Sequence, residues 1–171
     1  AIVGAGKMGS WLVESLCLDY EVGVYDSDIS KLKYLFKSHR LLSYEDIAKF
    51  EPDMLINAVS LQHTLTVYKD IMPYLPEKCM LADITSVKTP LRDFYLGSGR
   101  SFVSTHPMFG PTFANIKDLS NQSAIIIKES DFLGKAFFKD VYSSLRLKIF
   151  EYTFEKHDQT TAYSLSIPFA S

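Results

Sequence analysis

The sequence has few of the features that mark secreted, membrane-spanning or nucleic-acid-binding proteins. It contains only two cysteines, Cys17 and Cys79, which lie in apolar surroundings without metal-ligand spacing. We therefore expect reduced, buried thiols in a cytoplasmic protein. No apolar run approaches the roughly 20 residues that span a bilayer, and no signal peptide is recognised. A net charge of −2 and a pI near 6.1 give no general attraction to nucleic acid or to anionic membranes.

The 171 residues, 47% hydrophobic and 22% charged, suit one globular domain without repeats or low-complexity stretches. Strand-like and helix-like segments alternate, which predicts a parallel sheet covered on both faces. Strands are predicted at 1–3, 22–25, 54–59, 80–84, 101–105, 124–127 and 148–152. Helices are predicted at 8–19, 29–38, 44–49, 62–72, 90–95, 131–145 and from 154 onward. Both ends of the chain are expected to be cut, because it begins inside a strand and stops within a helix.

One helix carries a clear apolar pattern. The segment 131–145 has apolar residues at helical spacing, and these are expected to face the core: Phe132, Leu133, Ala136, Phe137 and Val141.

The first strand runs directly into the glycine-rich turn Gly4-Ala5-Gly6-Lys7-Met8-Gly9. The pattern G-x-G-x-x-G between a strand and a helix is typical of dinucleotide-binding sites. Gly4 permits a tight turn, Gly6 lets the backbone approach a pyrophosphate, and Gly9 lets the helix pack closely on the strand. With the alternating elements, this motif predicts an α/β fold of Rossmann type. The sheet would be doubly wound and mainly parallel, with a C-terminal connecting helix.

Asp26 ends the second predicted strand, 22 residues after Gly4. An acid at about this distance binds a ribose hydroxyl in such sites, although Asp26 could instead cap the next helix. Its carboxylate would repel the extra phosphate of NADP by about 4 kcal/mol at an intermediate dielectric. Ser27 and Asp28 follow where an NADP site often has arginine, and Lys31 is expected on the exposed face of a helix. The sequence therefore favours NAD.

Ligands in these sheets bind beyond the carboxyl ends of the strands. The expected cofactor-binding residues are Gly4, Ala5, Gly6, Lys7, Met8, Gly9, Asp26 and Ser60. Beyond two later strands lie Ser86 with Lys88, and His106. Ser86 could instead cap a helix beside a solvated Lys88, and His106 could simply bond to backbone. On a loop stiffened by flanking prolines, however, His106 could act as a general base with a pKa near 6.5.

Three segments in this order, G-A-G-K-M-G, D-I-T-S-V-K and S-T-H-P-M-F-G-P, resemble the prephenate dehydrogenase family, which includes the arogenate dehydrogenases. A fourth segment, 157–169, is similar to the family's H-D-x-x-x-A-x-x-S-x-x-P-H region. The resemblance spans essentially the whole chain, and the T-S-V-K and H-P-M-F-G-P pair is its most specific part.

The resemblance implies NAD-dependent oxidative decarboxylation of prephenate to 4-hydroxyphenylpyruvate in tyrosine biosynthesis, without a metal. By similarity, the catalytic residues would be His106, which takes the proton of the ring hydroxyl, Ser86, which holds that hydroxyl, and Lys88, which supports the site electrostatically. Residues 1–152 would form the dinucleotide-binding domain. Residues 153–171 would begin an all-α domain that forms a homodimer, closes the site and supplies an arginine for the ring carboxylate. The fragment is then expected to bind NAD but turn over poorly.

One residue departs from the family pattern. Phe169 stands where members of the family often carry a histidine of the substrate pocket. Arogenate remains an alternative substrate, because the residues that distinguish its amino group from the keto group of prephenate are not identifiable. Two further alternatives are a β-hydroxyacid dehydrogenase or imine reductase, which shares G-x-G-x-M-G, and a non-catalytic domain that senses NAD.

Overall fold

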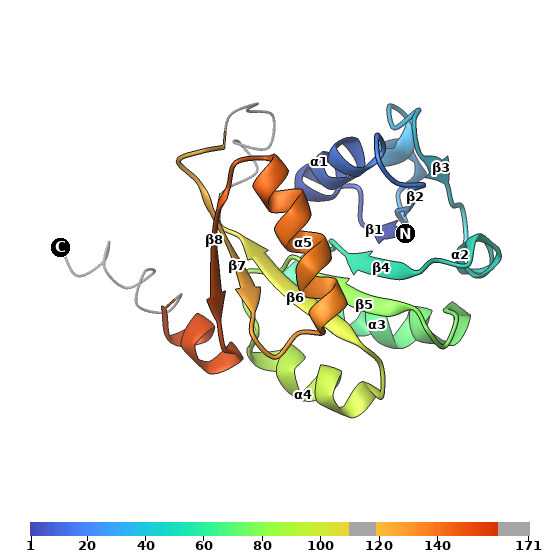
Figure 1. Cartoon of the computed structure of the whole chain (residues 1–171). Coiled ribbons are helices and arrows are strands. Elements are labelled where there is room, and N and C mark those ends of the chain that lie inside the picture. The colour runs from blue at the N-terminus through green and yellow to red at the C-terminus, as the bar shows by residue number, and fades with distance from the viewer. Residues whose placement is uncertain (110–118, 161–171) are drawn as a thin grey trace.

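The computed structural model describes residues 1–109 and 119–160, which form an eight-stranded sheet with helices on both faces (Figure 1). The strands are β1 (Ile2–Val3), β2 (Gly23–Tyr25), β3 (His39–Arg40), β4 (Met54–Asn57), β5 (Met80–Asp83), β6 (Phe102–Pro107), β7 (Ser123–Ile127) and β8 (Lys148–Tyr152). The α-helices are α1 (Lys7–Leu16), α2 (Tyr44–Phe50), α3 (Thr64–Ile71), α4 (Thr89–Ser98) and α5 (Phe132–Ser144). Residues 154–160 are also helical, and short 3-10 turns cover Ile29–Leu32, Leu61–His63 and Met72–Tyr74.

The strand order is β3-β2-β1-β4-β5-β6-β7-β8, and the first six strands in this order, from β3 to β6, are parallel to one another. Strand β7 pairs antiparallel with β6, and β8 lies parallel to β7. The order of the first six strands is that of a Rossmann sheet, and it reverses between β1 and β4. This confirms the predicted doubly wound, mainly parallel fold. The loops after β1 and β4 therefore flank the crevice where such sheets bind ligands.

Successive strand residues face opposite sides of the sheet, and each side has its own apolar core. Ile2 and Ile56 pack with α1 and α5, whereas Val3 and Leu55 pack with α2, α3 and α4. Phe154, from the last described helix, belongs to the second core and stacks on Phe102 at 6.0 Å. The segment 154–160 is thus packed against the sheet, on the face opposite α5.

The turn between β1 and α1 depends on two glycines. Gly4 has φ of +101°, and a β-carbon there would lie 2.8 Å from the backbone of Ala58 at the end of β4. A β-carbon on Gly9 would lie 1.9 Å from the carbonyl oxygen of Gly4. Only glycine fits at these two positions, so α1 starts directly against the carboxyl ends of the adjacent strands β1 and β4.

Two predictions of secondary structure were wrong. The segment 29–38 is not a helix beyond the 3-10 turn Ile29–Leu32, and it is followed by the short edge strand β3, which was missed. The carboxylate of Asp28 accepts hydrogen bonds from the N–H and hydroxyl of Ser30, which favours a tight turn over a full helix. His106 was placed on a loop, but it lies within β6, where it pairs with Ile125 of β7.

The apolar stripe predicted for α5 was also wrong in part. Phe132, Leu133 and Ala136 are exposed, and the residues of α5 that are buried are Gly134, Phe138, Val141 and Tyr142. Gly134 crosses β6 so closely that a β-carbon would lie 2.6 Å from Val103. This contact turns the helix by about one position and brings Phe138 rather than Phe132 into the core.

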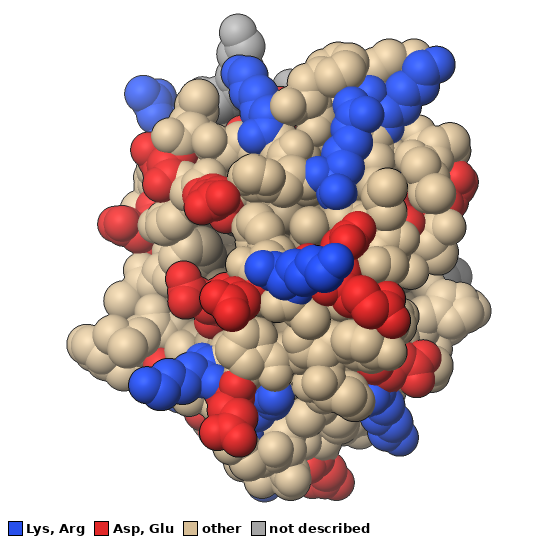
Figure 2. All heavy atoms as spheres, turned by 90° about the vertical axis from the view of Figure 1, so that its right-hand side faces the viewer, with Lys and Arg blue, Asp and Glu red and all other residues tan. Residues whose placement is uncertain are grey.

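The surface carries charges of both signs. Figure 2 shows basic and acidic side chains distributed among uncharged ones over one face of the molecule. Within the two described ranges, no helix combines the length and the apolar character that crossing a membrane requires.

Replacing Gly9 by alanine should destabilise the fold, because the new methyl group would collide with the carbonyl of Gly4. Overpacking of this kind costs about 1–3 kcal/mol. Gly97→Ala is the matched control, since a β-carbon there meets no atom within 4 Å and alanine favours a helix. Urea unfolding should show a lower free energy for Gly9→Ala and an unchanged or higher one for Gly97→Ala. Equal values would contradict the packing described here.

Candidate active site

A cleft of about 500 Å³ opens at the carboxyl edge of the sheet, where the strand order reverses. Four of the predicted cofactor residues line it: Gly4, Gly6, Asp26 and Ser60. Lys31, expected on an exposed helix face, also lines the cleft. Tyr25 and Tyr44 form one wall, with ring centroids 5.2 Å apart. The cleft has the size and position of a nucleotide site in this fold class.

Helix α1 begins at the cleft with its backbone donors uncapped. Gly6 is the N-cap residue, it offers no side-chain acceptor, and the first turn contains no acid. Free N–H groups and the positive end of the helix dipole can therefore hold a phosphate. The structure thus fits a dinucleotide at this point by the chemistry of its donors.

The carboxylate of Asp26 ties the glycine turn to the end of β2. Its Oδ2 accepts a hydrogen bond from the N–H of Ala5 at 2.7 Å, and its Oδ1 accepts one from the N–H of Asp28 at 2.8 Å. Asp28, not Asp26, caps the following 3-10 turn. The alternative in which Asp26 serves as a helix cap is therefore wrong, and its carboxylate faces the cleft.

The remaining predicted cofactor residues lie around the turn rather than in the cleft. Ala5 is buried, Lys7 is exposed, Met8 is half-buried, and Gly9 packs beneath Gly4. Of these, Ala5 acts on the cleft through its hydrogen bond with Asp26.

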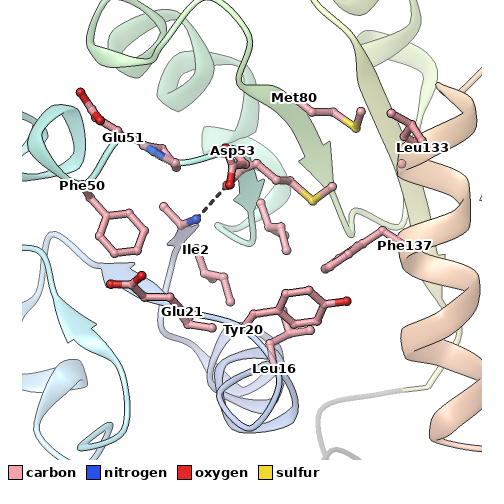
Figure 3. A pocket seen from close by; sticks show the side chains of 16 residues that line it. Ile2, Leu16, Tyr20, Glu21, Phe50, Glu51, Asp53, Met80, Leu133 and Phe137 are labelled. Atoms are coloured by element: carbon pink, nitrogen blue, oxygen red, sulfur yellow. Dashed lines mark hydrogen bonds between the residues drawn. The ribbon is translucent and has the colours of Figure 1, made fainter.

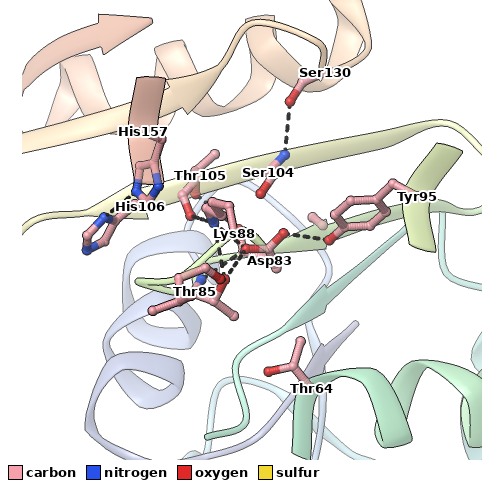
Figure 4. Close-up of polar contacts among 12 residues, drawn as sticks. Thr64, Asp83, Thr85, Lys88, Tyr95, Ser104, Thr105, His106, Ser130 and His157 are labelled. Carbon is pink, nitrogen blue, oxygen red and sulfur yellow. Dashed lines mark hydrogen bonds and ion pairs between the residues drawn. The ribbon is translucent and has the colours of Figure 1, made fainter. Parts of the chain in front are cut away.

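Lys88 is completely buried rather than solvated (Figure 4). Its ammonium donates to Oδ1 of Asp83 at 2.5 Å, to the carbonyl of Thr105 at 2.5 Å and to the hydroxyl of Thr85 at 3.3 Å. The other carboxylate oxygen, Oδ2 of Asp83, accepts from the hydroxyl of Tyr95 at 2.5 Å. The pair therefore joins the end of β5, the start of α4 and the strand that carries His106.

The pKa values of Asp83 and Lys88 are each set by two opposing effects, burial and the charge of the partner. Burial alone would raise the pKa of Asp83, but the ammonium of Lys88 and the hydrogen bonds from Lys88, Tyr95 and Thr85 keep it below its usual range. Burial lowers the pKa of Lys88, and Asp83 opposes that shift. Each charge is stable here only because the other is present.

His106 lies at the carboxyl edge of β6, half-buried, beside a second histidine. Its Nδ1 is 2.9 Å from Nε2 of His157, and Nδ1 of His157 is 3.0 Å from Oδ1 of Asp158. His157 and Asp158 belong to the helical segment 154–160. Ser86 is exposed beyond the end of β5, the strand next to β6. The catalytic candidates therefore share one edge of the sheet with the cleft.

The surroundings keep His106 neutral. Burial, the positive charge of Lys88 and the neighbouring His157 lower its pKa to about 3, so the expected value near 6.5 was wrong. Burial also lowers the pKa of His157, although Asp158 opposes the shift. With both pKa values lowered, each ring of this pair is neutral at pH 7 and keeps one nitrogen with a lone pair.

Sequence reasoning missed several residues that this site uses. Asp83, Thr105 and Tyr95 form the network around Lys88, and His157 contacts His106. An aspartate at the end of an apolar strand, five residues before a lysine, could have indicated the buried pair. Nothing in the sequence indicated the contact between His106 and His157, which are 51 residues apart.

Other features of the described residues carry less chemistry. A cavity of about 380 Å³ lies at the opposite, amino-terminal edge of the sheet, between Phe50, Met80 and Phe137 (Figure 3). Both cysteines are free, with Cys79 buried and Cys17 half-buried. No group of three or more potential metal ligands occurs in the parts of the chain that the structure describes. Residues 110 and 111 of the third motif and residues 161–169 of the fourth, which include Phe169, lie outside those parts.

The family model described as "Prephenate dehydrogenase, nucleotide-binding domain" matches residues 20–145. The chain is 30% identical to a probable arogenate/prephenate dehydrogenase of Methanocaldococcus jannaschii, with 92% of this chain and 37% of that protein covered. This chain thus spans little more than a third of that relative's length.

Two solved structures have the same fold. A prephenate dehydrogenase from Aquifex aeolicus matches with a TM-score of 0.82 and 22% identity, covering 99% of this chain and 67% of that one. The A. aeolicus enzyme in complex with hydroxyphenyl propionate and NAD+ matches with a TM-score of 0.79 and 21% identity, covering 99% and 66%.

Lys88→Met should destabilise the chain by about 3–5 kcal/mol, because it leaves the charge of Asp83 buried and unpaired. Lys139→Met is the matched control. Lys139 lies 3.1 Å from Glu151 with its side chain 49% exposed, and such surface pairs contribute about 1 kcal/mol or less. Chemical unfolding of both variants measures the difference. A Lys88→Met protein as stable as the control would contradict the buried pair.

Acid should weaken the fold through His106. The unfolded chain binds a proton at this residue below about pH 6.5, whereas the folded chain does so only near pH 3. The contribution of His106 to the free energy of unfolding is therefore fully present above pH 6.5. Between pH 6.5 and pH 3 it falls by about 1.4 kcal/mol for each pH unit of acidification. Urea unfolding at pH 7, 6 and 5 should show a shallower loss for His106→Asn than for the natural sequence. Parallel curves would contradict the lowered pKa.

Proposed function

The chain belongs to the prephenate dehydrogenase family, and from that premise we propose that its parent protein catalyses NAD-dependent oxidative decarboxylation of prephenate. Arogenate is the alternative substrate. The observation that carries the proposal is a neutral histidine, His106, on the same sheet edge as a cleft built from the glycine turn.

The cleft would hold the dinucleotide. The uncapped start of α1 suits the pyrophosphate, and the carboxylate of Asp26 suits the hydroxyls of a ribose. The same negative charge disfavours the extra phosphate of NADP, although Lys31 nearby offers a positive charge. When bound, the nicotinamide accepts the hydride that leaves C4 of the substrate ring.

His106 would act as the base. The ring hydroxyl donates to its free nitrogen and loses its proton there as the C4 hydride departs, which forms a carbonyl. The bond from the ring to the carboxylate then breaks, and its electrons pass through the diene to that oxygen. The resulting phenolate recovers the proton from His106, so that prephenate and NAD+ give 4-hydroxyphenylpyruvate, carbon dioxide and NADH. The two negative charges of prephenate would raise the pKa of His106 toward the range of an effective base.

Lys88 and Ser86 would have different roles. The ammonium of Lys88 is buried and bonded within the protein, so Lys88 would position the strand before His106 rather than touch the substrate. Ser86 is exposed and free to hold the ring hydroxyl. A domain boundary near residue 152 is part of the proposal, with residues 153–171 beginning a helical domain that forms a homodimer and completes the substrate site.

The test is NADH formation by the full-length protein, with prephenate and arogenate offered separately and NAD compared with NADP. We expect turnover of prephenate with NAD. Turnover of arogenate alone would change the substrate, and no turnover of either despite NAD binding would contradict the proposal.

His106→Asn should reduce kcat by about 10²–10⁴-fold, the usual contribution of a general base, without changing the affinity for NAD. His39→Asn is the matched control, since His39 is exposed at the far edge of the sheet and pairs with Glu21 at 3.0 Å. Its kinetics should match those of the natural protein. Retained turnover in His106→Asn would disprove the assigned base.

A further inference from the structure

A line of three side chains leads from the carboxyl edge of β6 into the helical segment 154–160. His106 contacts His157 at 2.9 Å, and His157 contacts the carboxylate of Asp158 at 3.0 Å. His157 is fully buried, whereas His106 is partly exposed. His157 therefore cannot meet a substrate and acts through His106, and the partly exposed Asp158 is bonded to the far side of the His157 ring.

The carboxylate sets the direction of the hydrogen bonds. Hydrogen bonds from Thr89, His157 and Lys88 keep the pKa of Asp158 below its usual range, although burial opposes this, and an ionised carboxylate only accepts. Nδ1 of His157 must therefore carry the proton. In a neutral ring the other nitrogen, Nε2, is then an acceptor, so the proton between the two rings belongs to Nδ1 of His106. The lone pair of His106 is left on Nε2.

We propose that His157 and Asp158 are positioning residues that hold His106 in the tautomer protonated at Nδ1, so that Nε2 is the base. This inference rests on the proposed function. In Figure 4 the second ring nitrogen of His106 points away from His157 and from the buried network of Lys88. Without this partner, His106 could carry its own proton on Nε2, and that nitrogen could then not accept the proton of the substrate.

The carboxylate of Asp158 is itself held from the other side of the site. Its Oδ1 also accepts from the backbone N–H of Lys88 at 3.1 Å, and its Oδ2 accepts from the hydroxyl of Thr89. These bonds join the segment 154–160 to the start of α4. They allow an alternative in which Asp158 and His157 only anchor that segment, and the two roles predict different mutant kinetics.

Two substitutions of His157 in the full-length protein separate the roles. In His157→Gln the side-chain oxygen can take the place of Nε2 and accept the proton of His106 Nδ1. In His157→Phe the site stays filled but has no acceptor. We expect kcat to remain within about 5-fold for the first and to fall about 10²-fold for the second, with the affinity for NAD unchanged in both. A purely structural role reverses the order, because a buried polar amide is tolerated less well than a phenyl ring. That reversed order would overturn the proposal.

Thr89→Val is the matched control for the anchoring bonds. It removes one hydrogen bond to Asp158 and leaves the contact between Asp158 and His157 in place. Its kcat should stay within about 3-fold of the natural value, as expected when the base keeps its orientation. A loss as large as that of His157→Phe would show that anchoring alone explains the effect.

The tautomer can be read without a substrate. Imidazole 15N NMR of the full-length protein at pH 7 should show His106 protonated at Nδ1 and unprotonated at Nε2, and His157→Phe should mix the two forms. A natural protein with His106 protonated at Nε2 would overturn the proposal. If neither prephenate nor arogenate is turned over, the proposed function fails while this measurement still decides the tautomer.

Discussion

The ion pair between Lys88 and Asp83 is the interaction on which the site depends. Neither side chain is accessible to solvent, and between them they bind the hydroxyl of Tyr95 and the carbonyl of Thr105. Tyr95 in turn contacts the hydroxyl of Tyr68, which donates to the carbonyl of Ala82. Removing two charges from water is costly, and it is tolerated only where every partner is supplied. The pair therefore fixes the residue that precedes His106. Burial lowers the pKa of His106, the positive charge of Lys88 adds to that shift, and the negative charge of Asp83 opposes it.

The strand that carries His106 changes partners along its length. Its first half, Phe102 to Ser104, pairs with β5, whereas Thr105 to Pro107 pair with the antiparallel β7. Where the parallel ladder with β5 ends, the ammonium of Lys88 donates a hydrogen bond to the carbonyl oxygen of Thr105. His106 is thus held by a regular ladder on one side, and on the other by a side chain. The backbone of β6 is therefore held on both sides of the strand beyond the point where its pairing with β5 ends.

The features that could be predicted from the sequence are those with local causes. The glycine turn, the acid at the end of β2 and the apolar runs of the inner strands each depend on neighbouring residues, and all are present as expected. The features that could not be predicted depend on contacts between distant segments. Lys88 is buried because β5 and β6 enclose it, and the face of α5 is set by Gly134 against Val103. The helix predicted for the segment 29–38 was wrong for a local reason, because the side chains of Asp28 and Ser30 bond to each other and favour a tight turn.

The position of His157 has a consequence for how the protein is made. Its ring reaches His106 only after β7, α5 and β8 have been placed, because the helical segment follows all of them in the chain. On a ribosome, the sheet and the nucleotide cleft can therefore assemble while His106 still lacks its partner. The order of synthesis thus separates the ability to hold a cofactor from the completion of the site. Once the chain has emerged through Tyr152, the strands of the described sheet and the residues that line the cleft are available, and the partner of His106 is still to come.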